Sequence, residues 1–330
     1  PKCPPSRQQS PLRSTCSEMR HLLSYTVYDR DGVLGEDMRA TLDSIGADGL
    51  ELLTSYDHPD PCFRGVTESV HLPYATDWMA AWEGRPYDMD DESARFYMFG
   101  RSREDVVSNV ADAIRYASEL DPAYGVFHAG DGPLDGLMVR DTGLDSRRVL
   151  DEMAEMMNTV VASLPGGEPP FRILFENLWW PGLRLLDDSD FRRLESRLEF
   201  ERWGVCVDTG HMMNCLPDIY TEQDGIAALE GIFSRYCDEL IDRVVTVHFH
   251  WSASYPYRRD YVEKRPGDDI ISYISEAFGH ISRIDQHMPF SDPSCNRLLE
   301  ILRPEYVTHE MPGSKAGMLE DFRQQRSLLP

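Results

Sequence analysis

The sequence predicts a (β/α)8 barrel, an α/β fold in a single domain, from two observations. Eight short runs rich in β-branched and aromatic residues alternate with longer stretches whose apolar residues recur every three or four positions. Strands that alternate with helices pair in parallel through right-handed crossovers. Eight such units in about 310 residues fit a closed barrel better than an open sheet, and no GxGxxG turn follows the first run.

The predicted strands, each followed by a polar loop, are 22–28, 48–53, 68–72, 124–128, 172–176, 204–208, 244–250 and 305–310. The predicted helices lie between them, at 36–46, 103–120, 146–164, 190–198, 222–241 and 296–302. The two longest connections, 74–100 and 251–290, are rich in Trp, Tyr and Phe. We expect them to be loops over a site rather than separate domains.

The barrel domain is expected to span residues 19–330. Residues 1–18 are rich in Pro, Ser and Arg and have no apolar period. This composition is typical of a disordered N-terminal tail, or of translation upstream of the true start.

The composition excludes several classes of protein. With 41% hydrophobic residues the chain can bury a core, so a wholly disordered protein is excluded. The 33 basic against 57 acidic residues give a net charge of −24, which disfavours a broad nucleic-acid-binding surface but leaves a local basic groove open. There is no membrane-spanning run and no signal-peptide pattern, so we expect a soluble cytoplasmic protein.

The seven cysteines are odd in number and form no CxxC pair. They therefore indicate neither a disulfide framework nor a thiolate zinc site, and reduced cytoplasmic thiols fit best.

Potential metal ligands end six of the eight predicted strands. The chemistry of such barrels lies at the C-terminal ends of the strands, and these six residues are His71, His128, Glu176, Asp208, His248 and Glu310. Three more lie close by in the sequence: His211 in DTGH, and Asp285 and His287 in DQH.

A lone histidine at a barrel rim is more often a hydrogen-bonded residue than a ligand. Imidazoles and carboxylates that converge on one mouth suit Zn²⁺, Mn²⁺ or Fe²⁺, and the absence of Cys from the set disfavours a structural zinc site. The set therefore predicts a catalytic metal centre. We expect His250 and His309, close to predicted ligands but on the other strand face, to lie behind the ligands or to face outward.

This set resembles that of the xylose-isomerase-like TIM barrel superfamily, which includes sugar and sugar-phosphate isomerases and epimerases as well as endonuclease IV. The resemblance runs over most of the chain after residue 20. Residues Glu176, Asp208, His248 and Glu310 match the set that holds one divalent ion in the isomerases and epimerases. The endonuclease IV branch binds three zinc ions, and all nine residues named above match its ligands in order.

The chain also departs from both branches. Glu176 is followed by Asn-Leu-Trp-Trp-Pro-Gly instead of the EPxNRxE-like segment of the epimerases. Compared with the nuclease, Trp179 and Trp180 replace small residues, the stretch between His248 and Asp285 is longer, and no basic loop for a DNA backbone is evident.

The resemblance implies a divalent-metal-dependent enzyme that uses manganese or zinc, with one ion and up to three. We expect a sugar or sugar-phosphate isomerase or epimerase that works through a metal-stabilised enediolate. Glu176 and Glu310 would be the acid/base pair, and His211 would orient a substrate oxygen. The residues expected to stack on a sugar-like substrate are Trp179, Trp180 and Trp251.

Two alternatives stay open: an endonuclease IV-like trinuclear zinc phosphoester hydrolase, and a barrel that binds a ligand without turnover. The net charge and the aromatic loops favour the isomerase, with a small neutral substrate rather than nucleic acid. By resemblance alone, a homo-oligomer is also expected.

Overall fold

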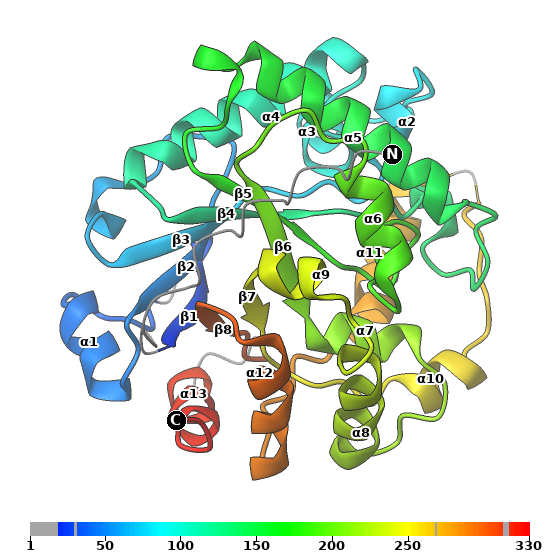
Figure 1. Ribbon diagram of the computed structural model, residues 1–330. Helices are drawn as coiled ribbons and strands as arrows, with labels where there is room; N and C mark the ends of the chain where they lie inside the picture. Colours follow the sequence, from blue (N-terminus) through cyan, green and yellow to red (C-terminus); the bar gives the residue numbers. More distant parts are fainter. Residues whose placement is uncertain (1–18, 30–31, 268, 313–316) are drawn as a thin grey trace, which may run out of the picture.

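The structure is a computed structural model that describes residues 19–29, 32–267, 269–312 and 317–330 (Figure 1). The predicted tail, residues 1–18, lies outside the described residues.

Eight parallel strands close into one barrel in the order β1-β2-β3-β4-β5-β6-β7-β8. Each strand pairs with its neighbours in sequence, and β8 pairs with β1 through Leu23 and His309. The strands are β1 (Arg20–Thr26), β2 (Gly49–Leu53), β3 (Thr67–His71), β4 (Tyr124–His128), β5 (Arg172–Glu176), β6 (Trp203–Asp208), β7 (Val244–His248) and β8 (Tyr306–His309). The predicted fold class and the eight predicted strands are confirmed.

Helices surround the barrel on its outer side (Figure 1). They are α1 (Met38–Ile45), α2 (Trp78–Trp82), α3 (Asp91–Met98), α4 (Arg103–Ala117), α5 (Ser146–Ser163), α6 (Asp188–Glu195), α7 (Thr209–Cys215), α8 (Glu222–Phe233), α9 (Asp238–Arg243), α10 (Tyr255–Asp260), α11 (Ile270–Ile281), α12 (Asn296–Leu302) and α13 (Met318–Arg326). Short 3-10 turns lie at Pro61–Phe63, Ser118–Leu120, Leu134–Gly136, Pro165–Gly167 and Pro293–Cys295.

Two features of the predicted helices were wrong. The stretch 222–241 is two helices, because α8 ends in tight turns after Phe233 and the Asp188 carboxylate accepts the Cys237 N–H at 3.2 Å. The connections 74–100 and 251–290 are not plain loops, since they contain α2 and α3, and α10 and α11. Trp78 and Trp82 of α2 are fully buried and belong to the core rather than to a site.

The barrel has two apolar layers. A small cluster that includes Leu22, Val126, Leu174 and Cys206 fills its interior, and a much larger cluster lies between the strands and the helices. Because side chains alternate along a strand, the inward position that follows Val126, Leu174 or Cys206 by two residues reaches the C-terminal mouth. On several strands, the fold therefore places the last inward-facing residue at the C-terminal mouth of the barrel.

Candidate metal centre

Strand alternation brings the predicted ligands to the mouth of the barrel. On β3 to β8, the inward-facing position at or just after the strand's end carries a histidine or a carboxylate, two residues after an interior side chain. The described residues hold several groups whose ligand atoms lie within 4.8 Å of one another: His71, His128 and Glu176; His211, Asp285 and His287; and His250, His287 and Glu310. The structure thus gathers residues that lie far apart in the sequence.

The first group surrounds Glu176, which is 1% exposed. Its Oε2 atom lies 3.1 Å from Nε2 of His71 and 3.3 Å from Nε2 of His128. Nδ1 of His71 lies 2.8 Å from the carbonyl of Leu72, so it donates there and Nε2 is left as the acceptor or ligand atom. The strands β3, β4 and β5 therefore supply two imidazoles and one shared carboxylate.

The second group forms around Asp208, at the end of β6. Its Oδ1 accepts the His211 N–H at 2.6 Å and so caps helix α7, while its Oδ2 lies 3.0 Å from Nε2 of His250. His250 Nε2 also lies 3.4 Å from Glu310. One carboxylate thus fixes the start of a helix and faces the centre.

Of the two positions expected for His250, behind the ligands or facing outward, the structure rules out the outward one. His250 lies two residues after His248, and residues two apart along extended chain share a face, so its ring enters the same mouth. Gly210 makes room for it, because a Cβ at this position would collide with the His250 ring. His309, by contrast, does face away from the mouth, with Nε2 3.0 Å from Nδ1 of His21.

The third group comes from α7 and the long connection after β7. Asp285 Oδ2 lies 3.5 Å from Nε2 of His211 and 3.1 Å from Nε2 of His287. His287 has a left-handed backbone, with φ of 48°, a conformation that non-glycine residues adopt at a cost and often at functional sites. His287 also lies 3.7 Å from Glu310, which links this group to the second.

The predicted ligand His248 lies deeper in the barrel. Its Nδ1 lies 3.3 Å from Glu176 and 3.4 Å from Glu310, and its Nε2 lies 2.7 Å from Oε1 of Glu51. Glu51 is fully buried, and its other oxygen accepts hydrogen bonds from Ser69 and Thr308. Sequence reasoning missed Glu51, although a lone carboxylate inside the apolar run GLELL was the available signal.

The centre brings carboxylates and imidazoles close together in a largely buried place. Burial disfavours the charged form of Glu176, but the charge of His248 and hydrogen bonds from His211 and His248 hold the pKa of this carboxyl well below its ordinary value. Burial lowers the pKa of His128 to about 3, so this imidazole is neutral. Burial also opposes protonation of His250, yet Asp208 and Glu310 raise its pKa to about 10.

The donor set fits divalent cations. Neutral imidazole and carboxylate are the ligands that Zn²⁺ and Mn²⁺ take, and the nearby cysteine, Cys206, is buried beneath the mouth with a pKa raised by desolvation. Among the described residues, Oδ1 of Asp285 and Nδ1 of His250 are buried with no hydrogen-bond partner. Buried polar atoms are nearly always paired, so these orphaned atoms are consistent with a bound cation.

The predicted tryptophans separate into two groups. Trp179 and Trp180 line a cavity of about 540 Å³ beside the centre, and the Trp179 ring centroid lies 4.9 Å from that of His211. Trp251 does not line this cavity, and its indole N–H donates to the Pro289 carbonyl at 3.0 Å. On another side, Tyr74 stacks on His128 at 4.4 Å between ring centroids and borders an aromatic cavity of about 330 Å³.

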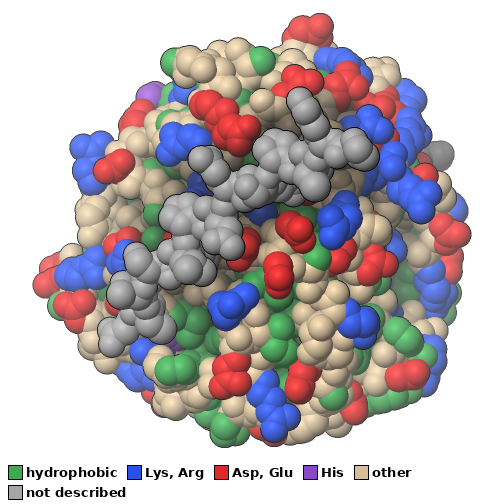
Figure 2. Space-filling view, viewed as in Figure 1, with side chains coloured by type: hydrophobic (Ala, Val, Ile, Leu, Met, Phe, Trp, Pro, Cys, Tyr) green, Lys and Arg blue, Asp and Glu red, His purple; other side chains and the backbone are tan. Residues whose placement is uncertain are grey.

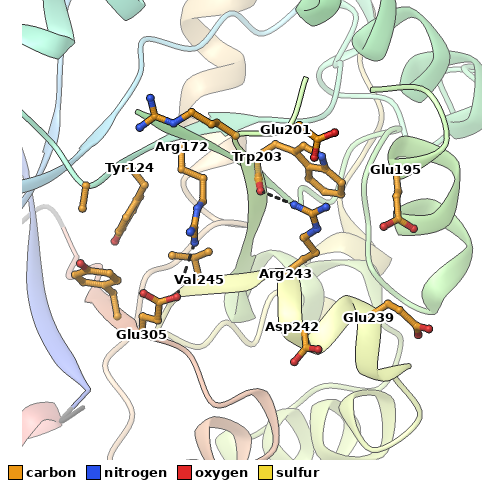
Figure 3. Close-up of a pocket in the computed structure, with 13 residues that line it drawn as sticks. Tyr124, Arg172, Glu195, Glu201, Trp203, Glu239, Asp242, Arg243, Val245 and Glu305 are labelled. Atoms are coloured by element: carbon orange, nitrogen blue, oxygen red, sulfur yellow. Dashed lines mark hydrogen bonds and ion pairs between the residues drawn. The ribbon is translucent and has the colours of Figure 1, made fainter. Parts of the chain in front are cut away.

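A cavity of about 710 Å³ lies at the opposite end of the barrel, among the first residues of β4 to β8 (Figure 3). The charged side chains of this cavity have partners at the surface: Arg172 lies 3.8 Å from Glu305, and the Arg243 guanidinium lies over the Trp203 ring. It contains no histidine. We therefore place the candidate chemistry at the C-terminal mouth.

Comparison with known proteins agrees with this architecture. Residues 98–323 match the family model described as xylose isomerase-like TIM barrel. The chain belongs to this family. None of the curated proteins matches the sequence.

Solved structures share the fold of this xylose isomerase-like barrel at low sequence identity. Endonuclease IV from Thermus thermophilus is 15% identical with a TM-score of 0.53, and the match covers 94% of this chain and 98% of that one. A D-tagatose 3-epimerase-like protein is 13% identical with a TM-score of 0.46, covering 94% and 97%. A sugar phosphate isomerase/epimerase from Parabacteroides distasonis is 11% identical with a TM-score of 0.47, covering 95% and 94%.

Members of the family are enzymes, and both sugar epimerases and endonuclease IV are among the structural neighbours. In the described part of the chain, no helix is both long and apolar enough to cross a membrane.

Proposed function

We propose that this xylose isomerase-like barrel is a metal-dependent phosphoester hydrolase with a multinuclear centre. The observation that supports this is the surplus of ligands. A one-ion isomerase needs four of them, whereas His71, His128, His211, Asp285 and His287 are five more that converge on the same buried mouth. Two or three ions in one site are typical of enzymes that cleave phosphoesters. The isomerase that the sequence favoured becomes the second candidate.

In this proposal Glu176 is the shared ligand, because its two oxygens face different groups. Oε2 faces His71 and His128, while Oε1 lies 3.3 Å from His211 and 3.3 Å from His248. Asp208, His250 and Glu310 would hold a second ion, and His211, Asp285 and His287 would hold a third. Divalent ions supply Lewis-acid chemistry there, polarising phosphoryl oxygens and lowering the pKa of water.

The chain's own side chains then orient the substrate and exclude water. Three carboxyl groups of the centre, Glu176, Asp285 and Glu310, stay ionised because the neighbouring imidazoles lower their pKa values; at Asp285 the effect of burial is opposed mainly by His287 and His211. A site that is already charged and desolvated needs little reorganisation during reaction. Tyr74, 42% exposed beside His128, closes one side of the mouth while leaving an entry.

The second candidate is the sugar or sugar-phosphate isomerase or epimerase. It would use one manganese or zinc ion at Glu176, Asp208, Glu310 and a histidine. The sequence favoured His248 for this position, but His248 Nε2 faces Glu51 at 2.7 Å, so we propose His250, which faces Asp208 and Glu310. Glu176 and Glu310 would move the proton, and His211 would orient a substrate oxygen. The observation that favours it is the pair of indole rings, Trp179 and Trp180, beside His211, since such rings stack on sugars. The net charge of −24 also favours a small substrate over nucleic acid in either candidate.

Elemental analysis of protein purified without chelator tests the proposal. We expect about three equivalents of zinc or manganese per chain, and about two after His287→Ala, because His287 serves the third position. The matched control is His58→Ala, an exposed histidine that is not among the ligand groups and whose Nδ1 lies 2.6 Å from Glu119; the metal content of this variant should not change.

Activity assays separate the two candidates. The same preparations would be given bis(p-nitrophenyl) phosphate, sugar phosphates, abasic-site DNA and free ketoses. Phosphoester cleavage that falls sharply in His287→Ala supports the hydrolase. One equivalent of metal, with ketose epimerisation that His287→Ala leaves intact, would overturn it in favour of the isomerase.

A further inference from the structure

The cavity of about 540 Å³ next to His211 is chemically distinct from the metal centre that it adjoins. Trp179 lines it and contacts the His211 ring, Asn214 lies one turn after His211 on α7, and Ile284 immediately precedes Asp285. A molecule in this cavity therefore sits directly beside the third ligand group. Its size is in the range of small-molecule sites.

The lining of this cavity has the opposite charge to the chain as a whole. Four arginines and a single acidic residue line it, in a protein with a net charge of −24. Two of these arginines are already neutralised: Arg140 pairs with Glu263 at 2.7 Å, and Arg259 pairs with Asp260 at 2.6 Å. The other two, Arg184 and Arg258, are not.

The side chains of Arg184 and Arg258 bond only to neutral groups within the described parts of the chain. Nε of Arg184 donates to the Trp180 carbonyl at 3.2 Å. Arg258 donates to the Ser254 hydroxyl at 2.9 Å and to the Leu216 carbonyl at 2.6 Å. Both are partly buried, so water compensates their charge incompletely. Asp190 interacts electrostatically with Arg184 and accepts its backbone N–H at 3.0 Å, but neither guanidinium forms a close ion pair with a carboxylate of the described residues. Half-buried guanidinium groups without such a pair commonly bind an oxyanion.

Asn214 provides an independent sign of a missing ligand. This side chain is 2% exposed, its Oδ1 accepts a hydrogen bond from Ser254, and its Nδ2 has no partner among the described residues. A buried amide donor without an acceptor is costly. An oxyanion oxygen in the cavity would supply that acceptor.

Aromatic rings form the apolar wall of the same cavity. The Trp180 ring packs against Gly132, where a Cβ would come within 2.8 Å of it, and the Trp179 and Trp180 centroids are 5.0 Å apart. Tyr255 and Tyr261 also line this cavity. Indole and phenol faces bind flat rings, whether aromatic or sugar.

We propose that this cavity is a substrate subsite for a phosphate or carboxylate group carried on a ring, held by Arg184, Arg258 and Asn214 between the tryptophans and tyrosines. The inference rests on the proposed function for the reacting centre, and it deepens that function by naming the substrate class. A substrate would place its anionic ring in the cavity and its reacting bond at the metal ligands.

Calorimetric titration of the metal-loaded protein tests this subsite with phenylphosphonate, which cannot be hydrolysed. We expect Arg258→Gln and Arg184→Gln each to weaken binding about tenfold or more, because each removes a charge-assisted contact. The matched control is Arg259→Gln, next in sequence and lining the same cavity but already paired with Asp260; it should change affinity less than about twofold. Circular dichroism would verify that each variant is folded.

Three further probes define the ligand. Benzamide, a neutral ring, should bind at least about tenfold more weakly than phenylphosphonate, and inorganic phosphate should lose the contribution of the ring. Benzoate separates the two oxyanions: binding as tight as that of phenylphosphonate assigns a carboxylate, and weaker binding assigns a phosphate.

Glu176→Gln separates this inference from the proposed function. Phenylphosphonate should still bind this variant, whose metal centre is disrupted. If Glu176→Gln abolishes binding while Arg258→Gln and Arg184→Gln do not, the anion binds the metals and the subsite is overturned, although the hydrolase proposal stands. If binding follows the arginines but no phosphoester is cleaved, the proposed function fails and the subsite remains.

Discussion

The two ends of the barrel handle charge in opposite ways. At the N-terminal end, charged side chains are about half exposed and meet in pairs, as do Arg172 and Glu305, and Figure 2 shows acidic and basic side chains interspersed over one face of the molecule. At the C-terminal mouth, Glu176, Asp208, His248 and His250 are 0–1% exposed. Surface pairs contribute little to stability, whereas buried charges are costly unless they are paired or bind metals. The difference indicates that the mouth is maintained for chemistry rather than for stability.

Among substitutions that test this difference between the two ends, Glu176→Gln should have the largest effect. The substitution removes the negative charge that faces His71, His128, His211 and His248, so metal content and turnover should both fall at least about 100-fold. Elemental analysis and a phosphoester assay measure the two effects. An active variant with its full metal content would show that the mouth does not depend on this carboxylate.

Two buried histidines, His250 and His309, allow a comparison between a side chain at the mouth and one that faces away from it. His250→Asn should weaken metal binding about 10–100-fold, because His250 faces Asp208 and Glu310. His309→Asn should leave metal content unchanged and lower the free energy of unfolding by about 1–3 kcal/mol, since it disturbs the bonds to His21 and Gln325. Equal metal loss in both variants would contradict the assignment of His250.

Proton release provides a test that needs no substrate. Because the pKa of His250 is raised to about 10, this imidazole is protonated at pH 7 in the metal-free protein. Metals bind the neutral form, so adding zinc should release about one proton from His250, and this contribution should vanish above pH 10. An indicator dye in weak buffer measures the release. His250→Asn should release correspondingly less, and an unchanged yield would count against His250 as a ligand.

The smallest effect is expected at the other end. Arg172→Gln removes one exposed charge pair, so the free energy of unfolding should change by less than about 1 kcal/mol and activity should not change. Urea denaturation and the phosphoester assay measure both. A large loss of activity would mean that the two ends are coupled in a way that their geometry does not suggest.

Much of this architecture was predictable because the barrel strands have a simple sequence pattern. An apolar run that ends in His or Glu, such as GVFH or RILFE, specifies both the strand and the side chain that reaches the mouth. The helices in 74–100 were harder to predict, because Trp78 and Trp82 are core residues, and aromatic content alone does not distinguish core from site. The N-cap of α2, Asp77, was the local signal.

The sequence could not place the His250 ring at the mouth, for a geometric reason. Its position relative to His248 depends on where β7 ends and on the space left by Gly210, which belongs to another strand-helix turn. The arginine-lined cavity could not be predicted from the net negative charge of the chain. Arg184 and Arg258 are 74 positions apart in the sequence and line the same cavity only in the fold. Such long-range juxtapositions are not encoded in any short motif.

The hydrogen bond from the His211 amide to Asp208 connects the start of helix α7 to the candidate metal centre. Helix α7 begins at a side chain that also faces the cation site, and the same short helix carries Asn214 into the arginine-lined cavity. Stripping the ions would leave that anchoring carboxylate to rearrange, and the turn it tethers would loosen with it. Metal-free protein should therefore still bind an oxyanion in the cavity, but more weakly than metal-loaded protein.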